Sequence, residues 1–566
     1  LHKEYRRQRQ MCIRDSSTWR AESDTLIETF ETNHPTLSRR SVKLVEDLTD
    51  ALISNDIIGQ GGGGNAGSIQ IQSVGDRYQT TGNNSSVLLL QSIGGGGGWT
   101  LFDEPAAYAI LGAIAANGGS AGSIELSNTT QLISAGTNSP ALLVQSIGGG
   151  GGATGKSKYG TQLGATGGSG NLQGGGISVD HTGLIGTIGD FSAGVLLQSI
   201  GGGGGLSDNV VDGGAILGAR AVAGSDSNLN AGAVTLTVEG TIQTRGNNSP
   251  GLNVQSIAGG GGWIGNVNGE LRLGSSEIAG SQNAGEITIS SSAAINTIGD
   301  NSIGLLGQSI GGGGGVAGIN TSLLSTQLGS NNSGSTNSGS LSLNNSGNVT
   351  TEGNNAAGIV VQSIAGGGGI AALQPLNGSS SSLKLGTVNG TTSQADAIAI
   401  SNQASVITHG DAAPALLAQS IGGGGGAIQS LNNPRVDTLN LGSTSTQNSS
   451  AGSITLSNVG ILSTSGQASP GLVLQAIGGG GGWSLLNSGA ANLGAVGLTN
   501  GRGGDISLNL DGTVITAGNS SPALVAQSIG GGGGYAGSSE GDGILGSSDS
   551  RGALGVRGSI DYGCLL

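Results

Sequence analysis

Short stretches of alternating apolar and polar residues recur along most of this chain. Ser453–Asn458 (SITLSN) alternates in this way, and a shorter run follows at Ile461–Thr464. After a polar segment that contains glycine, a third short run follows at Gly471–Ile477. Alternation with a period of two, interrupted by turn residues, is typical of β-strands. The pattern therefore predicts three short strands in each such segment.

These runs belong to an internal repeat that is marked by Gln-Ser-Ile followed by glycines. A turn glycine lies nine residues before each of the repeated glutamines, whereas the segment after the glycine run varies in length. Stacked strands must keep register, because a slip of one residue turns the core face of a strand outward. The repeated glutamines stand 52 to 57 residues apart, at Gln91, Gln145, Gln198, Gln255, Gln308, Gln362, Gln419, Gln475 and Gln527.

We therefore predict an all-β fold, a parallel β-solenoid of about nine repeats of 52–57 residues. Each repeat is expected to make two coils, one from the three strands and one from the glycine run and the variable segment. We expect the repeated glutamines either to form a hydrogen-bonded ladder from coil to coil or to cap local backbone, the alternative being an ordinary solvated position. The glycines indicate positive φ angles or closely approaching backbones. The bulky residues that follow them, such as Trp99, Trp263 and Trp483, are expected to pack over bare backbone, the alternative being to stack on carbohydrate.

Composition supports a thin aliphatic core and argues against nucleic acid as a partner. Glycine accounts for 117 of 566 residues, aromatic residues for 2% and charged residues for 10%. The net charge is −14, and residues 51–566 carry all of this excess, with 11 basic against 25 acidic residues. Such a chain offers no basic patch for phosphates or anionic membranes. Cys12 and Cys564 lie at opposite ends, so no disulfide framework is expected.

Four segments are expected along the chain. Arg6–Ser16 resembles translated adaptor sequence, so residues 1–16 are treated as non-native and the chain as a fragment. Residues 17–56 form an N-terminal segment in which residues 41–55 have the periodicity of a short amphipathic helix. Residues 57–535 form the solenoid, and residues 536–566 are a truncated tail rich in glycine and serine. The first 20 residues lack the apolar core of a signal peptide.

Two catalytic patterns occur and are discounted. Gly150–Ser157 matches the phosphate-binding pattern GxxxxGK[ST], but that chemistry needs a helix at Lys156, and a poor helix former follows. Gly118–Gly122 fits the nucleophile pattern GxSxG, which arises by chance in a chain so rich in glycine and serine. The histidines His181 and His409 occupy different offsets in their repeats. No catalytic or cofactor-binding residues are therefore assigned, and no cofactor is expected.

No metal site is assigned either. Asp226–Gly232 alternates oxygen ligands, but its glycine is one residue late for a calcium loop and the closing glutamate is missing. Asp190, Asp300 and Asp411 each follow the turn glycine, where most other repeats have Asn or Thr. They are interpreted as turn residues.

The QSIGGGGG repeats, the short strand modules, the acidic charge and the near-absence of cysteine resemble the passenger region of Gram-negative autotransporters, across roughly residues 57–535. The resemblance implies a right-handed parallel β-helix, carried to the cell surface or secreted through an outer-membrane β-barrel at the C-terminus of the full-length protein. It also implies an adhesin-like structural role, with host or matrix proteins or glycans as partners of the variable segments.

Two alternatives remain open. One is a β-helix enzyme that acts on polysaccharide, which would need carboxylates and basic residues clustered on one face; these are sparse and scattered here. The other is a disordered glycine-rich polymer, which the fixed offsets within each repeat oppose. The preferred hypothesis is a protein that is not an enzyme.

Overall fold

The structure is a computed structural model, and the residues that it describes all belong to the unit formed by residues 57–566. The helix expected within residues 41–55 lies outside the described residues. The structure describes residues 57–58, 64–100, 106–112, 118–168, 171–225, 228–278, 280–319, 325–331, 334–373, 382–388, 392–430, 435–444, 448–485, 487–497, 500–536 and 543–545.

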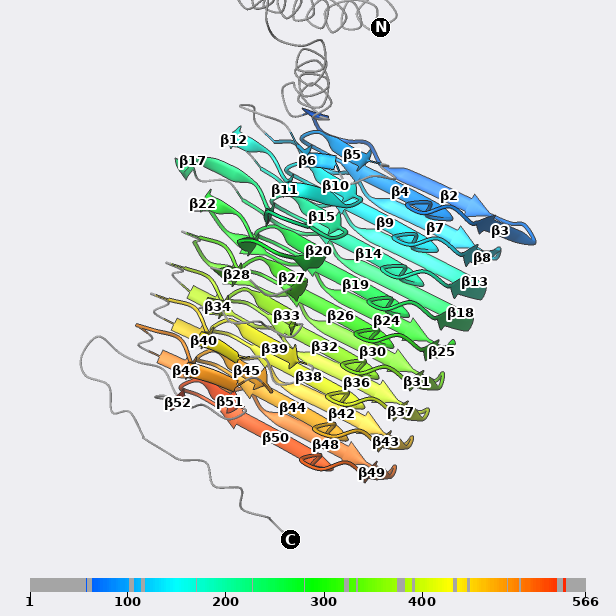
Figure 1. The fold of residues 1–566 in the computed structure, drawn as a ribbon. Coiled ribbons are helices and arrows are strands. Elements are labelled where there is room, and N and C mark those ends of the chain that lie inside the picture. Colours follow the sequence, from blue (N-terminus) through cyan, green and yellow to red (C-terminus); the bar gives the residue numbers. More distant parts are fainter. Residues whose placement is uncertain are drawn as a thin grey trace, which may run out of the picture. The chain divides into compact units, whose positions relative to one another are not determined.

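All described elements are strands, and they form long parallel sheets in which strand after strand stacks along one axis (Figure 1). The all-β solenoid predicted from the repeats is confirmed. A typical repeat contains six strands: β42 (Ile454–Asn458), β43 (Leu462–Thr464), β44 (Leu472–Ile477), β45 (Gly481–Ser484), β46 (Asn487–Leu493) and β47 (Asn500–Arg502). The first three are the strands that the alternating pattern predicts.

The first two strands of every repeat pair within one sixteen-stranded sheet. In two repeats the first and second strands join into one long strand, β13 or β18. Besides β42 and β43, the sixteen-stranded sheet holds β2 (Ile69–Ser73), β3 (Arg77–Thr80), β7 (Ile124–Asn128), β8 (Gln131–Ser134), β13 (Ile177–Thr187), β18 (Val234–Thr244), β24 (Ile287–Ser291), β25 (Ala294–Thr297), β30 (Leu341–Asn345), β31 (Val349–Thr351), β36 (Ile398–Asn402), β37 (Val406–Thr408), β48 (Ile506–Leu510) and β49 (Val514–Thr516).

The third and fourth strands form two nine-stranded sheets. The third strands, besides β44, are β4 (Leu88–Ile93), β9 (Leu142–Ile147), β14 (Val195–Ile200), β19 (Leu252–Ile257), β26 (Leu305–Ile310), β32 (Ile359–Ile364), β38 (Leu416–Ile421) and β50 (Leu524–Ile529). The fourth strands, besides β45, are β5 (Gly97–Thr100), β10 (Gly151–Thr154), β15 (Gly204–Ser207), β20 (Gly261–Val267), β27 (Gly314–Ile319), β33 (Gly368–Leu373), β39 (Gly425–Ser430) and β51 (Gly533–Tyr535).

The variable segments supply the remaining sheets, of ten, three and five strands. The ten-stranded sheet holds β46 with β1 (Ile57–Ile58), β6 (Ala106–Leu111), β11 (Ser157–Leu163), β16 (Gly214–Leu217), β21 (Leu271–Leu273), β28 (Thr326–Leu328), β34 (Ser382–Leu385), β40 (Arg435–Leu441) and β52 (Gly543–Leu545). The smaller sheets hold β12 (Thr166–Gly168), β17 (Arg220–Ser225) and β22 (Ser276–Ile278), and β47 with β23 (Gln282–Asn283), β29 (Thr336–Asn337), β35 (Thr392–Gln394) and β41 (Asn448–Ser450).

Each repeat makes one coil, so the expectation of two coils per repeat is wrong. The first five strands of each repeat pair with their equivalents in the next repeat; Gln91 lies opposite Gln145 and Ile124 opposite Ile177. The physical reason lies in the third strand, whose residues are buried on both faces in β44. The third strand therefore separates two lobes of one large coil and does not close a small coil of its own.

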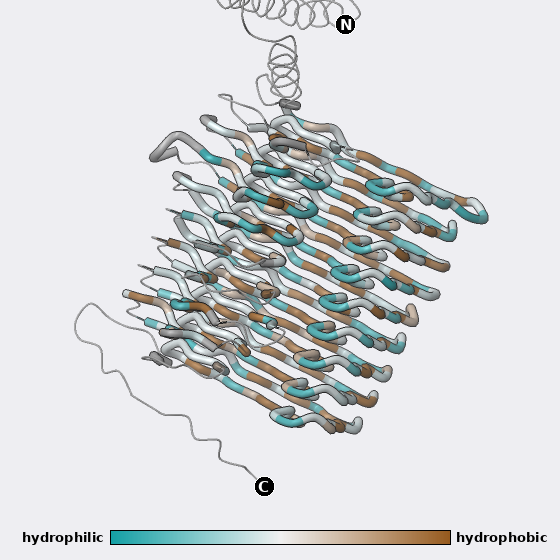
Figure 2. The backbone as a smooth tube through the Cα atoms, viewed as in Figure 1, coloured by the Kyte–Doolittle hydropathy of each residue, from teal (hydrophilic) through white to brown (hydrophobic). Residues whose placement is uncertain are grey.

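The two lobes have separate aliphatic cores. On one face of the third strand, residues such as Leu472 and Leu474 pack with Ile454, Leu456 and others of the first two strands. A second core lies between the fourth and fifth strands and includes Leu217, Leu271 and Leu441. Figure 2 shows the apolar positions aligned in columns from coil to coil. Each coil thus buries the aliphatic face of its neighbour, as in other solenoids.

The glycine run brings the backbones of adjacent coils into close contact. Gly204 pairs with Gly151 and Gly261 in register, and its φ angle is +135°. A Cβ atom there would overlap the carbonyl oxygen of Gly261. Both reasons for glycine that the sequence suggested, positive φ and close approach, are therefore present. The first position of the run is Ala258 or Ala365 in two coils and has no positive φ angle in any coil.

A tight turn between the second and third strands repeats in all coils. Its third residue adopts the left-handed conformation, which asparagine tolerates better than most residues. Five of these nine residues are asparagine, and the φ angles lie between +50° and +57° for Asn84, Asn138, Phe191, Asn248, Asn301, Asn355, Ala412, Ala468 and Ser520.

Candidate functional site

The repeated glutamines form the expected ladder. Gln145 Nε2 donates to Gln198 Oε1 at 2.7 Å, and Gln198 donates to Gln255 at 2.8 Å. The same bond joins every consecutive pair from Gln91 to Gln527, with distances of 2.7 to 2.8 Å. Because the seven internal glutamines are 0% exposed, the ladder is a structural element and not a surface for ligands.

In eight of the nine repeats a serine follows the glutamine, and this serine also ties coils together; Gln475 is followed by Ala476. Ser256 Oγ donates to the carbonyl of Gly232 at 2.9 Å and accepts from Gly285 N, in the next coil, at 2.8 Å. Ser146 bridges Gly122 and Gly175 in the same way. These polar columns fix register inside a core whose aliphatic contacts are not directional.

The phosphate-binding pattern does not form a phosphate site. Thr154 ends strand β10 and Ser157 begins strand β11, so no helix opens at Lys156. Without helix N-terminal amides there is no anion cradle of the kind this chemistry needs. Ser120, the serine of the GxSxG pattern, donates its hydroxyl to the Asn171 carbonyl at 3.1 Å. It belongs to the contacts between coils.

The two described histidines lie in different environments. His181 is 0% exposed, and its Nδ1 accepts from Asn128 Nδ2 at 2.7 Å. Burial lowers its pKa to about 4, against an opposing effect of Asp180, so it is neutral at pH 7. His409 is exposed, with Nε2 at 4.0 Å from the Glu352 carboxylate. Neither histidine is positioned by the other.

The acidic turn residues are structural, as the sequence predicted. Asp190, Asp300 and Asp411 each accept the backbone N–H of the next coil's turn through Oδ1, at 2.7 to 2.8 Å. Asp226 lies outside the described residues, while Asn228 Oδ1 accepts from Ser281 in the next coil at 2.8 Å. Among the described residues, no group of three or more His, Cys, Asp or Glu side chains could hold a metal ion.

The tryptophans pack, as expected. Trp263 and Trp483 are each 3% exposed, and the ring of Trp483 stacks on Tyr535 with centroids 4.1 Å apart. Trp99 is partly buried against the same column as Trp263.

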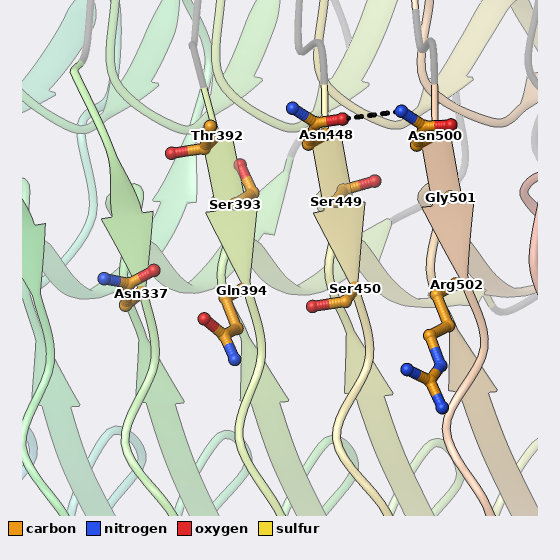
Figure 3. A pocket seen from close by; sticks show the side chains of 10 residues that line it. All are labelled: Asn337, Thr392, Ser393, Gln394, Asn448, Ser449, Ser450, Asn500, Gly501 and Arg502. Atoms are coloured by element: carbon orange, nitrogen blue, oxygen red, sulfur yellow. Dashed lines mark hydrogen bonds between the residues drawn. The ribbon is translucent and has the colours of Figure 1, made fainter.

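A groove of about 640 Å³ runs along the five-stranded sheet of the variable segments. Two rows of polar side chains line it, one at each end of the short strands (Figure 3). One row is Thr392, Asn448 and Asn500, and the other is Asn337, Gln394, Ser450 and Arg502. The residues between the rows, such as Ser393 and Ser449, are buried.

The groove offers hydrogen bonds and one positive charge. Asn500 Nδ2 donates to Asn448 Oδ1 at 3.0 Å, so this pair still has one amide donor group and one carbonyl facing the groove. Arg502 closes the far end of the second row. None of the ten residues that line the groove is Asp, Glu, His or Cys. The lining can bind a polar ligand, but it holds no carboxylate pair for acid–base chemistry.

Two buried charged groups outside the groove have shifted pKa values. Burial raises the pKa of Asp208 to about 6, opposed mainly by Lys156. Burial lowers the pKa of Lys384 to about 8, and its Nζ lies 3.4 Å from Thr444 Oγ1. Asp208 directly follows strand β15, whereas Lys384 lies on β34, and the two do not share a site. Sequence reasoning assigned neither them nor the groove residues. Asp208 and Lys384 follow no common offset, and at the groove positions the residue type changes from coil to coil.

The fold places the protein in the class of parallel β-solenoid repeat proteins. No protein-family model, curated protein or solved structure matches the chain. Within the described part of the chain there is no helix of the length and apolarity needed to cross a membrane.

Proposed function

We propose that the chain is the structural, adhesin-like passenger region of a Gram-negative autotransporter, exposed at the cell surface or secreted. The observation that carries the proposal is that different parts of each coil serve stacking and surface exposure. The glutamine, serine and glycine columns of the third and fourth strands are buried and serve stacking. The variable segments supply the sheet that bears the polar groove.

Binding is favoured over catalysis because of what lines this groove. Amides, hydroxyls and a guanidinium recognise hydroxyl-rich or peptide ligands. The stacked short strands hold these groups in two rows, and neighbours within a row are roughly 4.8 Å apart, the spacing of adjacent strands. Polysaccharide hydrolysis uses a pair of carboxyl groups. A β-helix enzyme remains the second candidate, and release of new reducing ends or unsaturated sugars from polysaccharides incubated with the chain would favour it.

A binding assay tests the proposal. The full chain is applied to immobilised matrix proteins, to a glycan array and to cultured host cells, beside a groove variant with Gln394→Ala, Asn448→Ala and Arg502→Ala. A matched control carries Gln70→Ala, Gln72→Ala and Arg77→Ala, which are exposed positions on another sheet. We expect the chain to bind at least one surface, with binding reduced in the groove variant alone.

Two results would count against the proposal. One is no binding by the full chain to any of these surfaces. The other concerns export: residues 57–566 fused to an autotransporter barrel should become accessible to protease on intact cells, and protection from protease would contradict the passenger assignment.

A further inference from the structure

A second groove, of about 290 Å³, lies on the outer face of the ten-stranded sheet near its N-terminal end. Tyr108 on β6 and Tyr159 on β11 line it and are 47% and 46% exposed. Their ring centroids are 5.8 Å apart, with 43° between the planes. Aromatic residues make up only 2% of the chain, and Trp263 and Trp483 are buried. Two exposed rings in contact are therefore the exception here.

A β-bulge brings the two tyrosines together. Ser157 pairs with Ala106 and Gly160 pairs with Tyr108, so β11 has one more residue than β6 between these pairs. The extra residue places Tyr159 beside Tyr108 although the two stand at different offsets in their repeats. Bulges re-aim side chains in this way and are common at binding sites.

Glycines form the floor of this groove. In register with Tyr108 come Gly160 on β11 and Gly214 on β16, and Gly214 lies beside Glu270 of the following coil. The four adjacent strands cover about 14 Å along the solenoid axis. A side chain at Gly160 would stand against the Tyr108 ring, because a Cβ there lies 3.4 Å from Tyr108 Cδ1. Because Gly160 and Gly214 have no side chains, the space beside the two tyrosines stays open.

The opposite wall is polar. Glu270 is exposed and Arg272 is half-buried, and both line the groove. Gln162, on β11, adds an amide between the two walls. A carboxylate accepts hydrogen bonds, a guanidinium donates them and an amide does both. On the other side, Lys158 Nζ lies 5.0 Å from the Tyr159 ring centroid, so the charges around the groove nearly balance.

We propose that this tyrosine groove binds a neutral oligosaccharide. A sugar ring has an apolar C–H face and a polar rim of hydroxyl groups. The tyrosine rings match the face and Gln162, Glu270 and Arg272 match the rim, and the groove has the length of a short oligosaccharide. An anionic ligand fits less well, because the chain has a net charge of −14. The inference rests on the proposed binding function and names a site and ligand class for it.

Calorimetric titration of the full chain tests this inference. The probes are hexasaccharides of β-linked glucose, β-linked N-acetylglucosamine, α-linked glucose and α-linked mannose. We expect at least one to bind, and the double variant Tyr108→Ala, Tyr159→Ala to weaken it at least about tenfold, since stacked aromatic groups contribute most of such contacts. Gly160→Val should block the groove with both tyrosines in place. Tyr78→Ala, an exposed tyrosine on β3 that is 41% exposed, is the matched control and should bind normally.

Two results would overturn the inference. In one, none of the four hexasaccharides binds the unaltered chain. In the other, a hexasaccharide binds the unaltered chain, the double variant and Gly160→Val equally well. If the unaltered chain still binds matrix proteins or cells in either case, the proposed function survives while this site does not. If it binds nothing at all, both fail.

Discussion

Replacing Gln308 by glutamate should make the stability of the solenoid depend on pH. Gln308 is fully buried in the middle of the ladder, accepts from Gln255 Nε2 at 2.8 Å and donates to Gln362 Oε1 at 2.7 Å. Glutamate has the same shape, but an ionised carboxylate only accepts hydrogen bonds. Only the protonated acid can also donate to Gln362, so the ladder continues through the variant at acid pH alone.

The magnitude follows from this geometry. Burial and the need to donate raise the pKa of the new carboxyl group above its unfolded value of about 4.3. A group with a raised folded pKa stabilises fully below the unfolded pKa, and this contribution is lost as pH rises towards the folded pKa. The free energy of unfolding, relative to the unaltered chain, should fall by about 1.4 kcal/mol per pH unit above about pH 4.3. At pH 7 the loss should be roughly 2–4 kcal/mol, because a buried charge then faces an acceptor.

Urea unfolding of the variant and the unaltered chain at pH 4 and pH 7 measures this difference. Amide hydrogen exchange in β19 and β32 shows whether the loss is local, since solenoids open coil by coil. Gln308→Leu should be destabilised equally at both pH values. Gln527→Glu should respond less, because this last glutamine of the ladder is partly exposed. If the difference between Gln308→Glu and the unaltered chain is the same at both pH values, the ladder does not act as described.

Three further predictions concern other columns. Ala468→Asn should raise the free energy of unfolding by about 0.5–1 kcal/mol in urea melts, because Ala468 has a φ of +52° and asparagine tolerates it better; a loss of stability would contradict this. His181→Asn should make thermal stability less sensitive to acid. The pKa of buried His181 lies near 4, below its ordinary 6.5, so its neutral form stabilises above pH 6.5 and that contribution is lost as pH falls towards 4. Equal pH dependence of the two melting temperatures would rule this out. Gly204→Ala should cost about 3 kcal/mol or more through overlap and strain, whereas Gly530→Ala, where φ is not positive and the nearest atom is 3.1 Å away, should cost less; similar melts would refute the glycine argument.

The periodic parts of the fold could be predicted from the sequence because each column repeats one physical requirement. Gln198 stands at a position where all the other coils also have glutamine, and a buried ladder explains why the same residue recurs there. The size of the coil was missed, although one signal was present. Leu472–Ile477 is almost continuously apolar, which indicates a strand buried on both faces rather than one side of a small coil.

The binding surfaces could not be predicted in the same way. Asn448 and Asn500 both stand 27 residues before the next repeated glutamine, but the residue type at that position changes from coil to coil, so no recurring residue marks it. Tyr108 and Tyr159 meet only because a bulge adds a residue to β11. Such surfaces depend on pairing register in the variable segments, which alternation alone does not determine.

The equivalence of coils has a consequence for how such a gene can change. Because the first five strands of each repeat pair with their counterparts one repeat away, the two faces of a coil carry the same columns of glutamine and glycine, and of serine in all repeats but the one with Ala476. Unequal recombination that deletes or duplicates one whole repeat would join a lower face to an upper face that already fits it. The protein can thus gain or lose length in steps of one coil without repacking, while the variable segments are reshuffled into new neighbours and new surfaces.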